Sequence, residues 1–441
     1  MSRSAYIWLV DVGTSSLKSM VVDRRFDVKA RISRTYACKT VSNMGMEIDP
    51  EMIWQTLVWC AHEFAAFKDH IGMIGICTFC PALTPMDPQG RALRNSIIHL
   101  DRRSYKQARR ALQIFGADKF LRITGNLPYP GGVSLTSLLW VKENEPDIFA
   151  AAFKFGHMNT FLMKRLVDKW VMDPTNASMT GLYETVSQGG WSFEIADTFG
   201  IDPCKLPAIV WCEEHVGGVS PLAANQLGIP SGTPVIMGGG DTACATYGAG
   251  GVQDGDILNI SGSSEIMTVT MEKPFPDPKY NLRTHVLKDR WIAFVITVSG
   301  IALEWFRSQF CRDMSKNSFY QEFMPAALSD TSALSTRHAP YLGGDRYSMV
   351  QRRGAFTGLN LETTRDALLR SMVDGNTRQM HTLLVKLQKK MRINKQIFLT
   401  GRGTSGALNE YKKRTWFRGY QLEEKKDCTL KGLYKLAARF I

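Results

Sequence analysis

The chain has 441 residues, of which 44% are hydrophobic and 22% are charged. This balance is typical of folded globular proteins and excludes global disorder and a collagen-like fibre. The formal net charge is +13, but residues 381–441 carry 15 Lys and Arg against 4 Asp and Glu, so most of the excess lies in this segment. We interpret it as solvated helix faces and expect no nucleic-acid partner, with a basic nucleic-acid surface as the alternative.

Neither a membrane span nor an export signal is predicted. The apolar run at residues 7–10 ends at Asp11, and the longest nearly apolar stretch, residues 293–306, falls short of the roughly 20 residues of a membrane helix. Most of the nine cysteines are therefore expected to be reduced, packed thiols in a cytoplasmic protein without a membrane partner. Cys77 and Cys80 have the spacing of a redox pair, but Pro81 follows directly, and we interpret both as packing residues.

The first predicted elements, in residues 7–22, are a strand, a tight turn of small residues at Gly13 and a second strand. Residues 257–269 repeat this design around Gly262, at an offset of 249 residues. The same offset aligns further pairs: Thr14 with Ser263, Ser15 with Ser264 and Ser19 with Thr268. Two similar domains are expected, each beginning with such a hairpin.

Helices and strands alternate in the rest of the chain, which predicts an α/β fold. Expected in chain order are a buried strand at 73–78, a helix at 103–115, a strand running into a glycine turn at 234–241, a pair of helices in 361–391, a strand, glycine turn and helix in 396–413, and a last helix at 430–440. The glycine cluster at residues 248–251 is the predicted boundary between a first domain, 1–250, and a second, 251–441.

Both hairpin turns have the composition of a phosphate site, because glycine lets backbone N–H groups approach a phosphate and Ser or Thr adds donors. Asp11 lies at the end of the first strand, where a carboxylate is a ligand for Mg²⁺. The chain lacks the glycine-lysine string of an ordinary P-loop.

Asp241 follows a predicted strand and three glycines that clear space for a ligand. This is the setting of a general base that removes a proton from a hydroxyl group. The alternative is a structural role, in which Asp241 caps the helix that begins at Thr242.

Several motifs together resemble the FGGY family of carbohydrate kinases over nearly the whole chain. They are the Asp11-Val-Gly-Thr-Ser-Ser hairpin, Glu47-Ile-Asp-Pro, Asp101-Arg-Arg-Ser, Ser134-Leu-Thr-Ser-Leu-Leu-Trp140, Gly238-Gly-Gly-Asp-Thr242, the Gly262-Ser-Ser turn and Arg353-Gly-Ala-Phe-x-Gly-Leu359. The resemblance implies a duplicated actin-like, ribonuclease H-like ATPase fold with a central cleft. It implies a sugar-binding first domain, a nucleotide-binding second domain, and transfer of phosphate from ATP, with Mg²⁺, to a sugar or polyol, a pentulose being the expected acceptor.

The resemblance also implies roles for individual residues. Asp241 would be the catalytic base, and Asp11 the Mg²⁺ ligand. The nucleotide would contact Asp11, Gly13, Thr14, Ser15 and Ser16, then Gly262, Ser263 and Ser264, then Gly401, Gly403 and Ser405. The sugar would contact Cys80, Pro81, Asp101, Arg102, Asp241 and Thr242; Cys80 and Pro81 align with a Met-His pair that contacts substrate in the xylulokinase-like branch. For Asp101, an ion pair ahead of a helix is the alternative.

Two other functions fit parts of the sequence. The turn at 401–406 is also a Gly-x-Gly-x-x-Gly between a strand and a helix, as in an NAD-dependent enzyme, but only 35 residues follow it. An actin-like ATPase without a sugar acceptor would share both hairpins. The oligomeric state is left open, with a homodimer as one candidate.

Overall fold

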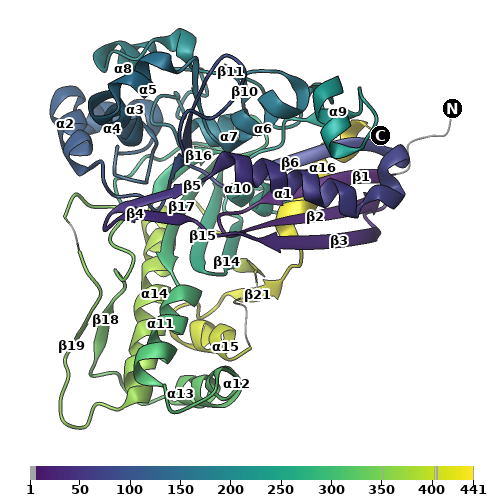
Figure 1. Ribbon diagram of the computed structural model, residues 1–441. Helices are drawn as coiled ribbons and strands as arrows, with labels where there is room; N and C mark the ends of the chain where they lie inside the picture. Colours follow the sequence, from purple (N-terminus) through teal and green to yellow (C-terminus); the bar gives the residue numbers. More distant parts are fainter. Residues whose placement is uncertain (1–5, 351, 402, 404–405, 441) are drawn as a thin grey trace. The chain divides into compact units, whose positions relative to one another are not determined.

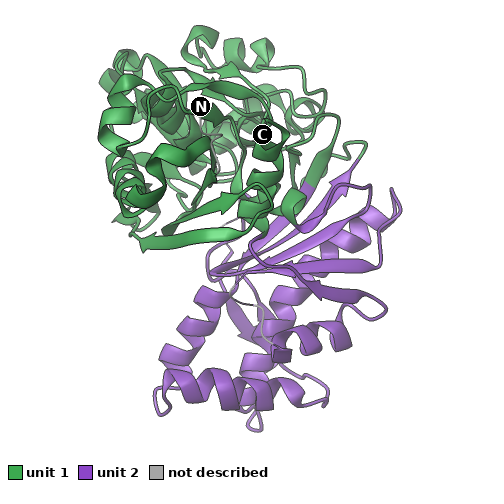
Figure 2. Cartoon of the chain, turned by 90° about the vertical axis from the view of Figure 1, so that its right-hand side faces the viewer, with its two compact units in different colours: residues 1–248, 272–292, 428–441 green, residues 249–271, 293–427 purple. Residues whose placement is uncertain are grey.

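The computed structural model describes residues 6–350, 352–401, 403 and 406–440 (Figure 1). Its contacts divide the chain into two compact units, which Figure 2 shows in different colours. Unit 1 comprises residues 1–248, 272–292 and 428–441, and unit 2 comprises residues 249–271 and 293–427. The expected boundary at residues 250 and 251 lies beside the first of these transitions, whereas segments 272–292 and 428–441 group with unit 1. The functional division into two domains stays a prediction.

The main sheet of unit 1 contains the predicted first hairpin. Its strand order is β12-β13-β6-β1-β2-β3, with β1 antiparallel to β2 and parallel to β6. The register places Asp11 opposite Lys18 on β2 and opposite Cys77 on β6. The strands are β1 (Tyr6–Val12), β2 (Ser16–Asp23), β3 (Val28–Thr35), β6 (Ile71–Thr78), β12 (His215–Gly218) and β13 (Pro234–Ile236).

Helices cover the main sheet of unit 1, and its central strands are mostly buried. The sheet contacts α1 (Pro50–Glu63), α6 (Met158–Val167) and α16 (Cys428–Ala437), the last of which packs on β1 and β6. Residues 7–12 are therefore all buried, the pattern expected of a strand covered on both faces. The predicted strand at 73–78 and the predicted last helix are confirmed as β6 and α16.

Two glycines let α16 approach α10 (Asp241–Ala249), the helix that begins at the predicted base. A Cβ atom on Gly248 of α10 would lie 1.8 Å from the Cys428 carbonyl oxygen, and one on Gly432 of α16 would lie 1.9 Å from the Cys244 carbonyl oxygen. The close crossing of the two helices thus requires glycine at both positions.

The rest of unit 1 consists of a second sheet and shorter helices. The second sheet has the order β4-β5-β8-β7-β9, with β4 (Lys39–Ser42), β5 (Gly45–Ile48), β7 (Ala82–Met86), β8 (Ser96–Ile98) and β9 (Lys154–Gly156). The helices are α2 (Tyr105–Phe115, predicted at 103–115), α3 (Ala117–Thr124), α4 (Leu135–Asn144), α5 (Pro146–Ala151), α7 (Pro174–Ala177), α8 (Phe193–Thr198) and α9 (Pro221–Leu227). The unit also contains strand β10 (Val171–Met172), which pairs with β11 (Ala208–Ile209), and strand β16 (Asn281–Thr284).

Unit 2 repeats the strand arrangement of unit 1, which confirms the internal duplication. Its sheet runs in the order β17-β15-β14-β20-β21, and β14 is antiparallel to β15 and parallel to β20, as β1 is to β2 and β6. Its elements are β14 (Ile257–Ser261), β15 (Ser264–Met271), β17 (Trp291–Val298), β18 (Arg337–Ala339), β19 (Ala355–Thr357), β20 (Gln396–Thr400), β21 (Gln421–Glu424), α11 (Gly300–Phe310), α12 (Lys316–Ser318), α13 (Met324–Ser329), α14 (Arg365–Gln388) and α15 (Gly406–Thr415).

The predicted pair of helices in residues 361–391 is wrong, because the structure has one helix there, α14, of 24 residues (Figure 1). Gly375 near its centre does not break the helix. Instead, a Cβ atom at this position would lie 2.6 Å from the His338 carbonyl oxygen, so glycine lets β18 pack closely on the helix. Among the helices that the structure describes, none is long and apolar enough to cross a membrane.

Candidate active site

Asp11 lies buried at the carboxyl end of β1, between β2 and β6. The Lys18 Nζ atom is 3.5 Å from its Oδ2 atom, and the Cys77 thiol donates to its Oδ1 atom at 3.7 Å. Burial raises the pKa of the Asp11 carboxyl to about 6, with Lys18 opposing this rise and the charge of Asp241 adding to it. Asp11 and Asp241 are therefore close enough for their charges to interact.

The turn between β1 and β2 is held by residues that follow β3. Tyr36 Oη donates to the Gly13 carbonyl at 2.6 Å, and the Cys38 thiol donates to the Thr14 carbonyl at 3.4 Å. Ser15 is exposed, and Gly13, Thr14 and Ser16 are half-buried, so the predicted phosphate turn is accessible. Its carbonyl groups are thus fixed while its small side chains stay at the surface.

Asp241 is the first residue of α10 and follows the glycine turn after β13, where sequence analysis placed it. Gly238 has a φ of +65°, and a Cβ atom there would lie 2.0 Å from the Ile76 carbonyl oxygen, so this turn requires glycine. Asp241 is half-buried, and its Oδ1 atom accepts hydrogen bonds from the Thr242 N–H at 2.6 Å and the Thr242 hydroxyl at 3.1 Å. Burial raises the pKa of Asp241, and the charge of Arg283 opposes this rise.

Arg283, on β16, was not predicted to belong to this site, but its charge acts on Asp241. Its Nη2 atom donates to Cys80 Sγ at 2.8 Å and to the Thr175 carbonyl at 3.0 Å. A Cβ atom on Gly240 would lie 2.5 Å from the same nitrogen, so the guanidinium occupies the space that glycine leaves beside Asp241. Thr175 in turn accepts the Gly240 N–H at 2.7 Å through its hydroxyl. The only sequence signal was a charged residue within a short, otherwise uncharged strand.

Cys80 and Pro81, predicted to contact the sugar, follow β6 at the same edge of the sheet. Cys80 is half-buried and Pro81 is buried. Burial raises the pKa of the Cys80 thiol to about 12, with Arg283 opposing this rise, so the thiol stays protonated at neutral pH. Cys77 and Cys80 are both free thiols, as the packing interpretation expected.

Asp101 and Arg102 are held by other parts of unit 1. The Asp101 carboxylate accepts the Met46 N–H at 2.8 Å and forms an ion pair with Arg103 at 2.7 Å, just ahead of α2. Arg102 donates to the Pro130 carbonyl. The geometry shows the ion pair of the alternative interpretation for Asp101, and the sugar contact of both residues stays a prediction.

The second hairpin and the glycine turn after β20 lie together in unit 2. The Ser263 and Gly262 carbonyls accept the N–H groups of Ser299 at 3.1 Å and Gly300 at 3.0 Å, at the start of α11. The Gly403 N–H donates to the Ser261 carbonyl at 2.9 Å. The residues of this hairpin and turn that were predicted to contact the nucleotide are Gly262, Ser263, Ser264, Gly401 and Gly403. Ser405, which was also predicted to contact it, lies outside the described residues.

Lys412 of α15 is a second residue that sequence analysis did not assign to the site. It is buried, forms an ion pair with the buried Glu265, and lies 3.4 Å from Ser261 Oγ. In sequence it belongs to a basic run on a helix, which is typical of an exposed face. The pair fixes the end of β14 beside the second hairpin.

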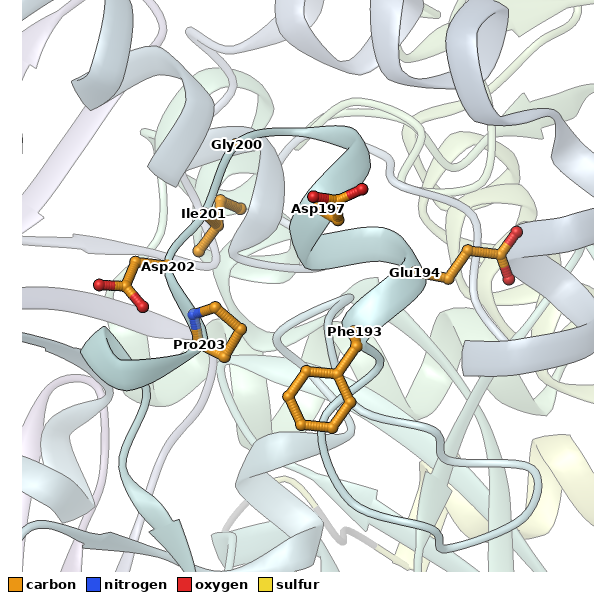
Figure 3. Close-up of a pocket in the computed structure, with 7 residues that line it drawn as sticks. All are labelled: Phe193, Glu194, Asp197, Gly200, Ile201, Asp202 and Pro203. Carbon is orange, nitrogen blue, oxygen red and sulfur yellow. The ribbon is translucent and has the colours of Figure 1, made fainter.

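A separate hollow of about 670 Å³ lies around α8 (Figure 3). It is lined by the side chains of Phe193, Glu194, Asp197 and Asp202 among others, and it contains none of the predicted site residues.

The duplicated sheets, each with a small-residue hairpin at a strand end, define an actin-like ATPase fold with two related halves. Solved structures with this arrangement include ligand-bound xylulose kinase from Lactobacillus acidophilus, with a TM-score of 0.89 at 22% identity, covering 98% of this chain and 88% of the other. Plasmodium falciparum glycerol kinase with ADP has a TM-score of 0.83 at 19% identity, over 98% and 88% of the two chains.

Sequence comparison narrows the class to one family. The sequence model of the N-terminal domain of the FGGY family of carbohydrate kinases matches residues 6–248. Xylulose kinase from Staphylococcus xylosus is 25% identical over 405 residues, covering 90% of this chain and 83% of the relative. Gluconokinase from Bacillus subtilis is 24% identical over 403 residues, covering 88% and 78%. The chain belongs to the FGGY family of carbohydrate kinases.

Family membership confirms the predicted fold and the predicted class of reaction. The protein is a carbohydrate kinase, a phosphotransferase that uses ATP and an alcohol group as acceptor. This favours the kinase over the two alternatives, an NAD-dependent enzyme and an actin-like ATPase without a sugar acceptor.

Proposed function

We propose that the protein transfers the γ-phosphate of ATP to a hydroxyl of a pentulose-like sugar, with Asp241 as the general base. The observation that carries this proposal is the cluster at one end of the unit 1 sheet, where the charge of Asp241 acts on Asp11 and the charge of Arg283 acts on Asp241. The pentulose is supported by the relatives named xylulose kinase.

The residues of this cluster have complementary roles in the proposed reaction. Asp241 accepts the proton of the acceptor hydroxyl, and that oxygen then forms a bond to the γ-phosphorus while the bond to ADP breaks in line. Arg283 opposes the rise that burial causes in the pKa of Asp241, because an adjacent positive charge favours the carboxylate. The glycine turn at residues 238–240 lets β6 and the Arg283 guanidinium pack closely beside Asp241.

The carboxylates of this cluster fit a Mg²⁺ ion that arrives with the nucleotide. No group of three or more His, Cys, Asp or Glu side chains that could hold a metal exists among the described residues. Proteins hold Mg²⁺ through one or two carboxylates while phosphate oxygens and water complete its shell, and Asp11 provides such a carboxylate. When bound, the ion neutralises charge on the transferred phosphate. The turn at 13–16 in unit 1, and Gly262, Ser263, Ser264, Gly401 and Gly403 in unit 2, would contact the nucleotide.

The base is tested with Asp241→Asn, a change that keeps the size and hydrogen-bonding capacity of the side chain. Sugar-dependent turnover should fall by about 10²–10⁴-fold, the usual contribution of a general base, while ATP binding and the melting temperature stay near wild type. Asn is about as good a helix cap as Asp. An unchanged kcat would therefore leave Asp241 with a structural role only, and both quantities need to be measured on the same preparation.

A further inference from the structure

Unit 2 contains a cleft of about 570 Å³ between the segment after α13, the outer side of α14 and the end of α15. Five arginines line it: Arg337, Arg370, Arg378, Arg414 and Arg418. None of the residues predicted to contact nucleotide or sugar belongs to its lining. The cleft is thus distinct from the site of the proposed reaction.

The two carboxylates that line the cleft already have hydrogen-bond or ion-pair partners. Asp330 forms an ion pair with Arg370 at 2.7 Å and also accepts the Ser332 hydroxyl at 2.8 Å. Asp374 accepts the indole N–H of Trp416 at 2.7 Å. Within the described part of the chain, Arg370 is therefore the one arginine of the cleft with a carboxylate partner.

Structural roles account for part of this cluster. Arg370 donates to the Asp330 carbonyl at 2.9 Å and Arg414 to the Leu328 carbonyl at 2.8 Å, so both cap the carboxyl end of α13. Among the described residues, the Arg378 side chain makes one hydrogen bond, at 3.3 Å to the His338 carbonyl, and the Arg418 side chain makes one, from its Nε atom to the Arg414 carbonyl at 2.6 Å. Helix capping leaves these two side chains, and the exposed Arg337, unexplained.

Two buried polar atoms in the wall of the cleft also have no hydrogen-bond partner among the described residues. They are the Thr336 hydroxyl oxygen and Arg370 Nε, on residues that are 1% and 4% exposed. Buried polar atoms in native proteins nearly always have a partner, either protein, water or ligand. At these two atoms, water or a bound group would supply the missing hydrogen bond.

We propose that this cleft binds a small, multiply charged anion that carries phosphate groups. Guanidinium groups bind phosphate through paired, charge-assisted hydrogen bonds, and a polyvalent anion relieves the repulsion among four arginines that lack carboxylate partners. The volume of about 570 Å³ is that of a small-molecule site. The ligand would be a phosphorylated metabolite or an inorganic polyphosphate.

The test measures binding of inorganic tripolyphosphate by calorimetry, with saturating ADP present to occupy the nucleotide site. The cleft variant is Arg378→Gln with Arg418→Gln. Its matched control is Arg24→Gln with Arg25→Gln, which removes the same charge from exposed positions in unit 1. Wild type and control should bind alike, and the cleft variant should bind at least about tenfold more weakly, since each lost charge-assisted contact weakens binding by such a factor. Melting temperatures are measured for all variants. If the double variant does not fold, tripolyphosphate binding to Arg337→Gln, a change at an exposed position of the same cleft, takes its place in the test.

Three outcomes would overturn the proposal. Equal weakening in the cleft variant and the control would mean that only net charge matters. Loss of tripolyphosphate binding when ADP is present would place the anion in the nucleotide site. Variant-sensitive binding of a short RNA without binding of tripolyphosphate would make the cleft part of a nucleic-acid surface. A glucose phosphate assayed in the same way distinguishes a phosphorylated metabolite from polyphosphate as the natural ligand.

Discussion

The two hairpins share a backbone arrangement, but their carboxylates differ in the cation they pair with and in how far that cation is buried. In unit 1, Asp11 is paired at 3.5 Å with Lys18, whose side chain is 48% exposed, and its pKa is raised to about 6. In unit 2, Glu265 is paired with Lys412, and both side chains are almost completely buried. A weakly paired carboxylate can exchange its partner for a metal ion, whereas a buried pair cannot separate without a large loss of stability.

This difference shows how a duplicated fold divides its work. Both halves keep the antiparallel hairpin and the parallel neighbouring strand. Unit 1 has the titratable carboxyls of Asp11 and Asp241 near the ends of its strands. In unit 2, the carboxylate of Glu265 is neutralised by Lys412 within the core. Variants at these charged groups test the contrast between the two units.

Lys412→Met should destabilise the protein by about 3–5 kcal/mol, because it leaves the buried Glu265 without its counter-charge. The double variant Lys412→Met with Glu265→Leu should recover most of this loss. Lys18→Met in unit 1 should change stability by less than about 1 kcal/mol, because the Lys18 side chain is 48% exposed and water screens its 3.5 Å contact with Asp11. Chemical denaturation measures all three, and equal losses for Lys412→Met and Lys18→Met would remove the contrast between the hairpins.

Asp11→Asn should reduce turnover by about 10³-fold, since the charge neutralisation that a metal ion supplies is worth several kcal/mol. The Mg²⁺ dependence of the remaining activity should change, whereas sugar binding and folding should survive. Steady-state kinetics over a range of Mg²⁺ concentrations measure this effect. Wild-type kinetics in the soluble variant would show that the residue is structural.

The raised pKa of Asp11 predicts a pH dependence of stability in the absence of nucleotide and Mg²⁺. The folded state binds the proton of the Asp11 carboxyl more tightly than the unfolded state does. The contribution of Asp11 to the free energy of unfolding is therefore most favourable below about pH 4 and is lost as the pH rises through about 6. The change is about 3 kcal/mol, since one pKa unit corresponds to about 1.4 kcal/mol. Denaturation between pH 4 and 7 measures the free energy of unfolding of the wild type and of Asp11→Asn, and the difference between the two isolates the contribution of Asp11. A difference that does not vary with pH would contradict the burial of a titrating carboxyl.

Arg283→Lys keeps the charge beside Asp241 but loses the planar guanidinium that holds Cys80 and Thr175. We expect kcat to fall about tenfold, as for one lost charge-assisted hydrogen bond, with the KM for ATP unchanged. Arg370→Lys is a matched control, because Arg370 is also buried and also donates to a backbone carbonyl, but in unit 2. A loss of stability without a loss of kcat in Arg283→Lys would give it a structural role only.

The sequence predicted most of what depends on local pattern. Alternating apolar runs and glycine turns located both hairpins, β6, α2 and α16, and the glycine turn before Asp241. Arg283 could not be found in this way, because it meets Cys80 across 203 positions of the chain through the fold alone. Lys412 was hidden for a different reason: its basic neighbours indicate an exposed face, and only the packing of α15 reveals that this one lysine is buried. The single helix α14 was missed because Gly375 serves packing there and does not end the helix.

In the proposed reaction, the charged cluster of unit 1 directs phosphate to a sugar hydroxyl and not to water. Mass spectrometry after incubation with ATP, Mg²⁺ and separate ketoses, aldoses, polyols and sugar acids tests this choice of acceptor. We expect one class of acceptor to gain a phosphoryl group, pentuloses foremost, and ADP release to depend on that acceptor. Release of inorganic phosphate at the same rate with or without any acceptor would contradict the proposed reaction.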